Sequence, residues 1–129
     1  MFNKNILKFY VTALEESYID VYNYNNQFYY FKYEGFTYSI DIYSDTVQFI
    51  ALDVYTLKDN ELLEVYNRVN EVNLKAEFTK FIIEDNSICA ITRFYIHTNS
   101  NPYFNFDFNS YLWRMRDAII LFLEKINNR

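Results

Sequence analysis

The side chains that perform most enzymatic chemistry are scarce in this sequence, which has one histidine, His97, and one cysteine, Cys89. A Ser–His–Asp relay or a histidine-based metal site needs further groups arranged around the imidazole. His97 lies at the end of an expected strand, as ordinary surface histidines do, and Cys89 lies in an apolar run typical of a structural thiol. These residues predict no catalytic, metal or cofactor site, so we expect a protein that is not an enzyme.

Three pairs of carboxylates are close enough in sequence for general acid–base chemistry, namely Glu15–Glu16, Glu61–Glu64 and Glu84–Asp85. Such a pair works only when burial separates the pKa values of its two members. Glu61 and Glu64 share one face of an expected helix because they are three positions apart. We expect both on a solvated face, with Glu61 stabilised near the positive end of the helix dipole.

Three asparagines, Asn67, Asn70 and Asn73, recur at every third position toward the end of the same expected helix. Asparagine disfavours a helix interior because its amide competes for backbone hydrogen bonds. We predict that Asn70 bonds to the chain entering the next strand and holds this corner, while Asn73 ends the helix. Ligand binding by these side chains is the alternative.

A dense aromatic segment precedes and enters the last expected helix, and it allows two interpretations. The first is an exposed protein-binding surface, because aromatic and arginine side chains are enriched at interfaces. Its residues are Phe104, Phe106, Phe108, Trp113 and Arg116. The second is a further core strand over 103–108, with the three phenylalanines facing inward. Trp113, Ile120 and Leu121 lie off the main apolar seam of the helix, so that helix is either deeply buried or shared with a second subunit.

Composition predicts one globular domain over residues 1–129 and excludes several classes of function. The chain is 51% hydrophobic, and its net charge is −5, with scattered basic residues, which disfavours binding to duplex nucleic acid. A single cysteine excludes a disulfide framework. No stretch has the length and hydropathy of a membrane span, and the beginning of the chain lacks the features of a signal peptide. We expect a cytoplasmic protein that does not bind membranes.

The first half of the chain predicts a helix followed by three strands. Apolar residues three and four apart indicate a helix over 3–17, and residues 18–27 look like a connection with little regular structure. Residues 27–56 predict a three-stranded antiparallel meander with a tight turn at Gly35, where positive φ is needed. Its third strand, from Thr46, is apolar almost throughout, which indicates a central place in the sheet.

The second half predicts a helix, two strands and a final helix. Asp59 is expected to cap a helix that ends near Asn73. The expected buried stripe of this helix is Leu62, Leu63, Tyr66 and Val69. Two strands follow around a turn at residues 85–87. The last helix, capped by Asn109 or Ser110, has the seam Leu112, Met115, Ile119, Phe122 and Ile126. The order α-β-β-β-α-β-β-(β)-α predicts an α+β fold, an antiparallel sheet of five or six strands flanked by helices.

This element order resembles the type III secretion chaperone-like fold and, within it, the YbjN-like bacterial proteins. Three features carry the resemblance: the hairpin over 31–42 around a single glycine, the asparagine-spaced second helix that runs into a lysine-containing strand, and the closing helix RDAIILFLEKI. The resemblance covers nearly the whole chain. It implies a binding or chaperone-type module, commonly dimeric, with no catalytic residues.

We therefore predict non-catalytic binding of another protein, of itself, or of both, with a homodimer as the expected assembly. Two alternatives remain from the residues alone. The acidic net charge suits an inhibitor or immunity-type protein that binds a basic enzyme. A small-ligand site on the curved sheet requires polar groups that converge on a cavity, for which Tyr38, Arg93 and His97 are the candidates.

Overall fold

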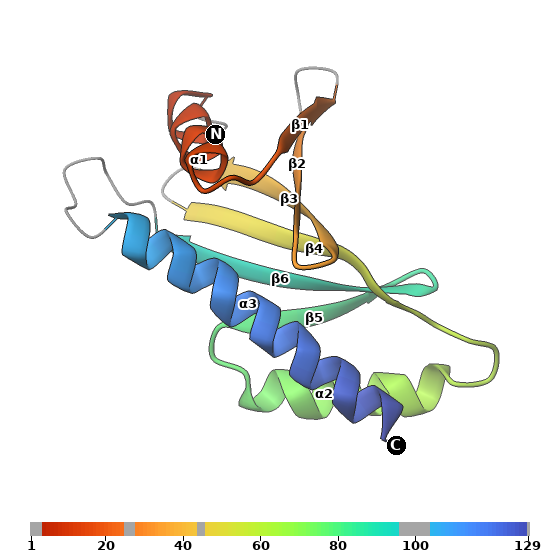
Figure 1. The fold of residues 1–129 in the computed structure, drawn as a ribbon. Helices are drawn as coiled ribbons and strands as arrows, with labels where there is room; N and C mark the ends of the chain where they lie inside the picture. Colours follow the sequence, from red (N-terminus) through yellow and green to blue (C-terminus); the bar gives the residue numbers. More distant parts are fainter. Residues whose placement is uncertain (1–3, 25–27, 44–45, 96–103, 129) are drawn as a thin grey trace.

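The computed structural model describes residues 4–24, 28–43, 46–95 and 104–128 (Figure 1). In chain order its elements are α1 (Lys4–Glu16), β1 (Val21–Tyr24), β2 (Phe28–Tyr33), β3 (Phe36–Tyr43), β4 (Thr46–Thr56), α2 (Leu62–Lys75), β5 (Thr79–Glu84), β6 (Ser87–Tyr95) and α3 (Phe104–Asn127). The fold is α+β, with helices flanking one sheet, and this confirms the predicted class.

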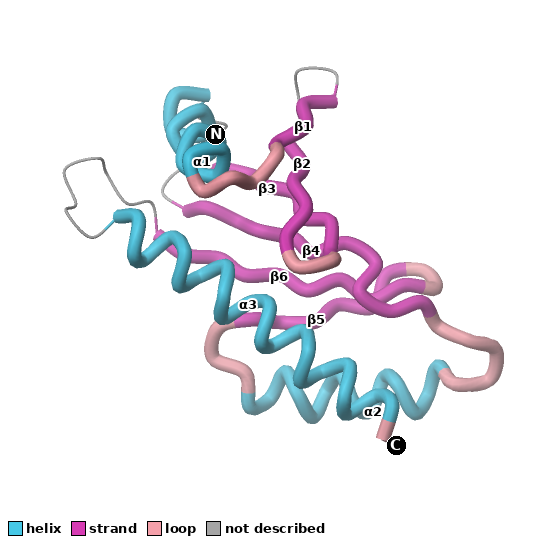
Figure 2. Tube along the Cα trace, in the orientation of Figure 1, coloured by secondary structure: helices cyan, strands magenta, loops and turns pink. Residues whose placement is uncertain are grey.

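The strands form one antiparallel sheet of six in the order β1-β2-β3-β4-β6-β5 (Figure 2). The predicted meander is β2–β3–β4, and β4 lies between β3 and β6, as its apolar sequence indicated. Val47, Gln48 and Phe49 are all buried, so both faces of β4 are covered at this point. β1 and β5 form the two edges of the sheet.

The core lies on one face of the sheet, beneath α1 and α3. A row of directly paired residues crosses five strands and is buried throughout: Phe31, Tyr38, Ala51, Ala90 and Phe81. The predicted seam of α3 covers part of this face, and each of its five residues is at most 1% exposed. α1 adds the buried stripe Leu7, Tyr10, Ala13 and Leu14. Its ring contact with β6 places α1 on the same face.

β1 is a strand in a segment that we predicted to be an irregular connection. It pairs with β2 in antiparallel register, with Val21 opposite Phe31. The prediction was wrong because the asparagines at positions 23, 25 and 26 disfavour a strand, while the neighbouring valine and tyrosines favour one. Pairing with β2 decides in favour of the strand. The sixth strand of the sheet therefore comes from here.

The hairpin between β2 and β3 turns at Glu34 and Gly35, whose φ angles are 49° and 88°. Two successive residues with positive φ make a type I′ turn, whose twist matches that of the strands it joins. Glycine adopts this conformation without a steric penalty, and the prediction at Gly35 is confirmed. The turn brings Glu34 beneath α3, where it meets Arg116 at 3.8 Å.

The start of α2 is set by a buried carboxylate. Glu61, which is 7% exposed, occupies the N-cap position in place of the predicted Asp59. Its oxygens accept hydrogen bonds from the Tyr55 hydroxyl (2.8 Å) and from the backbone N–H of Lys58. Our prediction that Glu61 and Glu64 share a solvated face was wrong for Glu61, because these donors compensate its burial; Glu64 is exposed.

The buried face of α2 also differs from the predicted one. Val65 and Val69 face the core, whereas Leu62, Leu63 and Tyr66 are each more than half exposed. Glu61, Val65 and Val69 are four positions apart and all buried, so they lie on the face toward the core and the larger side chains point outward. Hydrophobic spacing alone did not reveal this, because α2 is apolar on two sides.

α3 begins at Phe104, so the backbone of residues 104–108 is helical. The strand interpretation of 103–108 was therefore wrong, as was the predicted cap at Asn109 or Ser110. Positions 104, 108, 111 and 115 continue the helical period of the seam, whereas residues 104–108 also alternate with a period of two, and the helical period prevails. The side chains of Phe104, Phe106 and Phe108 lie outside the described residues, as do Tyr103 and His97.

Candidate functional site

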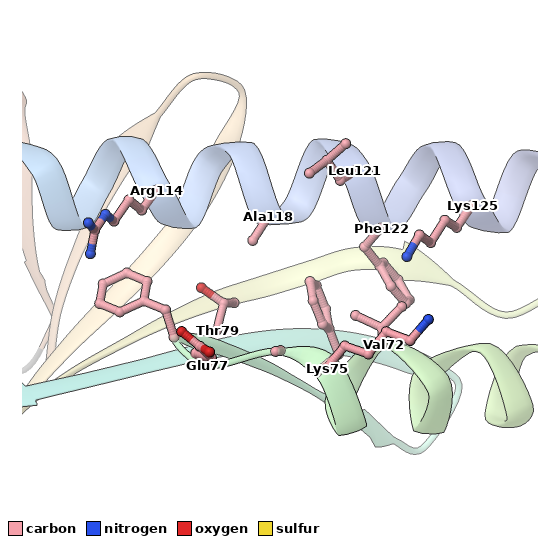
Figure 3. Close-up of a pocket in the computed structure, with 12 residues that line it drawn as sticks. Val72, Lys75, Glu77, Thr79, Arg114, Ala118, Leu121, Phe122 and Lys125 are labelled. Atoms are coloured by element: carbon pink, nitrogen blue, oxygen red, sulfur yellow. The ribbon is translucent and has the colours of Figure 1, made fainter.

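A groove of about 440 Å³ runs between α3 on one side and the corner from α2 to β5 on the other (Figure 3). Among the described residues it is lined by Val72, Lys75, Ala76, Glu77, Phe78, Thr79, Phe81, Arg114, Ala118, Leu121, Phe122 and Lys125. All of these come from only two chain segments, 72–81 and 114–125. Local sequence therefore supplies the residues, and the packing of α3 over β5 brings them together.

The floor of the groove is apolar and buried. Phe81 of β5 and Phe122 of α3 are both buried, and their rings stack with centroids 4.2 Å apart. Stacked aromatic pairs bury large areas and fix the distance between the elements that carry them. On the α3 side the groove is lined by the small side chain of Ala118 and by Leu121, which is 58% exposed.

The corner between α2 and β5 is held by Asn73. Its Nδ2 donates to the carbonyl oxygen of Phe81 (2.7 Å), and its Oδ1 accepts from the N–H of Phe81 (2.8 Å). The side chain therefore imitates a neighbouring strand at one residue of the β5 edge. We predicted this role for Asn70, which is exposed instead; the role was right and the residue was wrong, since Asn73 faces the strand.

The predicted C-cap was also wrong, because the C-cap of α2 is Ala76 rather than Asn73. Lys80 supports this helix end by donating from Nζ to the carbonyl oxygens of Asn73 and Ala76. A cation here satisfies carbonyl groups that have no partner within the helix and complements the negative end of the dipole. Lys80 thus serves the helix terminus.

Three cations line the groove, namely Lys75, Arg114 and Lys125. None forms an ion pair within the described residues, and the only carboxylate in the lining is Glu77. The groove therefore carries excess positive charge, although the whole chain has a net charge of −5. An apolar floor beneath unpaired cations attracts ligands that are both apolar and acidic.

Arg114 is positioned by an aromatic series that starts in the core. Its guanidinium carbon lies 5.6 Å from the centroid of the Phe78 ring. Phe78 stacks on Tyr111 at 5.5 Å, and Tyr111 stacks on Phe94 at 4.1 Å. The cation–π contact keeps this charged end beside the groove while the guanidinium remains accessible to a ligand.

Two of the predicted partner-binding residues, Trp113 and Arg116, have described side chains, and neither lines the groove. Trp113, which is 53% exposed, lies on the outer side of α3 within 5.9 Å of the Arg116 guanidinium carbon. Arg116 bonds to Asp117 at 2.9 Å and reaches Glu34, which raises the pKa of its guanidinium. The structure thus brings Trp113 and Arg116 together as one surface, with Ile120 exposed on the same helix.

The predicted small-ligand group is not assembled. Tyr38 is fully buried on the core face of the sheet, whereas Arg93 is exposed on the opposite face, where its Nε donates to Gln48. The strand alternation separates them because Tyr38 pairs with Ala51 and Arg93 with Gln48. Burial raises the pKa of the Tyr38 phenol and keeps it neutral, and its hydroxyl has no partner among the described residues.

Cys89 is buried, as predicted, next to the β5 edge strand. Within the described residues no group of three or more histidine, cysteine, aspartate or glutamate side chains is arranged to hold a metal ion. No helix in this part of the chain is long and apolar enough to cross a membrane.

The groove is not predictable from the sequence, for a physical reason. Its cations are scattered over three positions, 75, 114 and 125, and look like ordinary solvated lysine and arginine residues. The available signal was their placement on α3, where Arg114, Ala118, Leu121 and Lys125 recur at intervals of three and four. That spacing marks one face of the helix, but only the tertiary structure shows what lies opposite.

No protein-family model matches the chain, and no curated protein matches it in sequence. Among solved structures it is similar to the crystal structure of YbjN from E. coli, described as a candidate transcription regulator. The two superimpose with a TM-score of 0.70 at 12% sequence identity, over 95% of this chain and 91% of YbjN. At that identity the likeness concerns the fold alone: this chain has a YbjN-like fold.

Proposed function

We propose that this protein is a non-catalytic binding module that holds a segment of another protein in the groove between α3 and the α2–β5 corner. The observation that carries the proposal is the combination of a buried, stacked apolar floor with three cations that have no ion-pair partner within the described residues. The chain is acidic overall, so this local excess of positive charge selects a partner segment that is apolar and negatively charged.

The YbjN-like fold supports this proposal at the level of shape. We further propose that the protein acts as a chaperone-type binder and that it is located in the cytoplasm, as the sequence implies.

We also propose that the protein is a homodimer whose subunits meet at the Trp113–Arg116 surface on α3. Trp113 and Ile120 are exposed apolar residues on one side of that helix, and such residues favour contact with a second chain.

The proposal is tested by blocking the groove. The tagged native chain and the Ala118→Trp variant are used to capture partners from the lysate of the native host, at low and high salt, with mass spectrometry as the readout. Ala118 lines the groove, so a tryptophan at this position fills part of it, and we expect the variant to lose a partner that the native chain retains. High salt should weaken the native interaction because the charges at the rim are solvated.

A Lys32→Glu variant is the control, because Lys32 is exposed on β2, away from the groove. It should capture the same partner as the native chain, and circular dichroism should show that both variants are folded. Equal capture by a folded Ala118→Trp variant would refute the assignment of the groove.

A further inference from the structure

The cations of the groove are divided between its two ends, and its one carboxylate, Glu77, belongs to the α2–β5 corner. Arg114 and Lys125 are eleven residues apart on α3, which corresponds to about 16 Å along the helix axis. Ala118 and Leu121 lie between them, and Lys75 joins Lys125 at the second end (Figure 3). A ligand that satisfies both ends needs two negative groups separated by an apolar stretch of this length. A fatty acid, with one carboxylate, satisfies only one of them.

The edge of β5 is closed to an incoming strand where it meets the groove. Strand addition requires the outward-facing N–H and C=O groups of alternate residues, which in β5 are those of Thr79, Phe81 and Ile83. The Asn73 amide occupies both groups of Phe81, the middle residue. An extended peptide would leave its own groups unpaired at this point, which disfavours it. A helix satisfies its own backbone and needs only side-chain contacts.

We propose that the occupant of the groove is a single amphipathic helix of the partner protein, with an acidic residue at each end of its apolar stripe. This inference rests on the function proposed above and specifies its ligand. A helix of about three turns spans the distance between Arg114 and Lys125. The two acidic residues are about eleven positions apart, and the apolar residues lie on the same face, about four and seven positions after the first of them.

The probe for this inference is a fluorescein-labelled, lactam-bridged helical peptide of about 14 residues built on alanine and glutamine. It carries glutamates about eleven positions apart, with leucines between them on the same face. Binding to the full chain is measured by fluorescence anisotropy. We expect saturable binding, weakened about tenfold when one glutamate becomes lysine. A peptide with the same composition but with both glutamates at one end should bind about tenfold more weakly as well.

Charge exchange provides the matched control. Arg114→Glu should weaken the acidic peptide about tenfold and should bind the peptide with one lysine end more tightly than the native chain does. Lys32→Glu should leave both affinities unchanged. Equal affinities of the native chain and Arg114→Glu for all peptides would overturn the inference. So would tighter binding of an extended, proline-containing version of the acidic peptide.

The two proposals can fail separately. If Ala118→Trp abolishes capture of the native partner but no helical peptide binds the native chain, the groove is the binding site and its occupant is not this helix. If decanoate binds and is displaced by neither the acidic helical peptide nor its one-lysine version, the ligand is a fatty acid and the helix is excluded. If Ala118→Trp retains the native partner, the groove has no role in binding that partner and both proposals are wrong.

Discussion

Two tyrosine hydroxyls illustrate how differently the same group acts in this protein. The Tyr38 hydroxyl is buried without a partner among the described residues, whereas the Tyr55 hydroxyl donates to the buried carboxylate of Glu61. We expect Tyr38→Phe to raise the free energy of unfolding by about 1 kcal/mol and Tyr55→Phe to lower it by about 1–2 kcal/mol. Urea unfolding measures both changes. A loss of stability in Tyr38→Phe would show that its hydroxyl is satisfied.

Asp41, on β3, makes stability depend on pH. Partial burial raises the pKa of its carboxyl above the ordinary value of 3.8. The folded state therefore binds the proton more tightly than the unfolded state, so Asp41 lowers stability progressively as the pH rises from about 3.8 through the folded pKa. We expect Asp41→Asn to be more stable than the native chain at neutral pH, with a difference that shrinks toward pH 3. A difference independent of pH would contradict this assignment.

At the scale of elements, the contact between α2 and β5 depends on one side chain. Asn73→Ala leaves the N–H and C=O of Phe81 unpaired at the edge of the sheet, so we expect it to lower the free energy of unfolding by about 1–3 kcal/mol. Asn70→Ala removes an exposed amide and should change the free energy of unfolding by less than about 0.5 kcal/mol. Urea unfolding of the two variants provides the comparison, and equal effects would refute the role of Asn73.

Element type was predictable where the hydrophobic period was long and consistent. The seam of α3 from Leu112 to Ile126 and the alternation in β3 each indicate one structure only. The failures fall where two signals compete. α2 is apolar on two sides, so its sequence does not show which side is buried; the buried side is the one that carries Glu61. Residues 104–108 fit both a helical and a strand period. The groove was not predictable because it is formed by segments about 40 residues apart, whose approach is a property of the tertiary fold.

At the scale of the whole molecule, the outer side of α3 is the surface through which we propose that two subunits join. Trp113 is exposed, so Trp113→Glu should leave the fold intact, as circular dichroism will report. If the Trp113–Arg116 surface joins two subunits, light scattering will find a dimer for the native chain and a monomer for this variant. Tyr66→Glu on α2 alters an equally exposed aromatic residue and should remain dimeric. A dimer that persists in Trp113→Glu would exclude this surface.

The central claim is that a protein segment lies in the groove between α3 and the α2–β5 corner. Site-specific photo-crosslinking in the native host tests it most directly, with benzoylphenylalanine placed at Leu121 in the groove or at Lys32 on β2. We predict a discrete cross-linked partner from position 121, absent from position 32 and lost when Arg114 and Lys125 are both changed to glutamate. The same cross-link from both positions, or none from position 121 in a folded chain, would contradict the account.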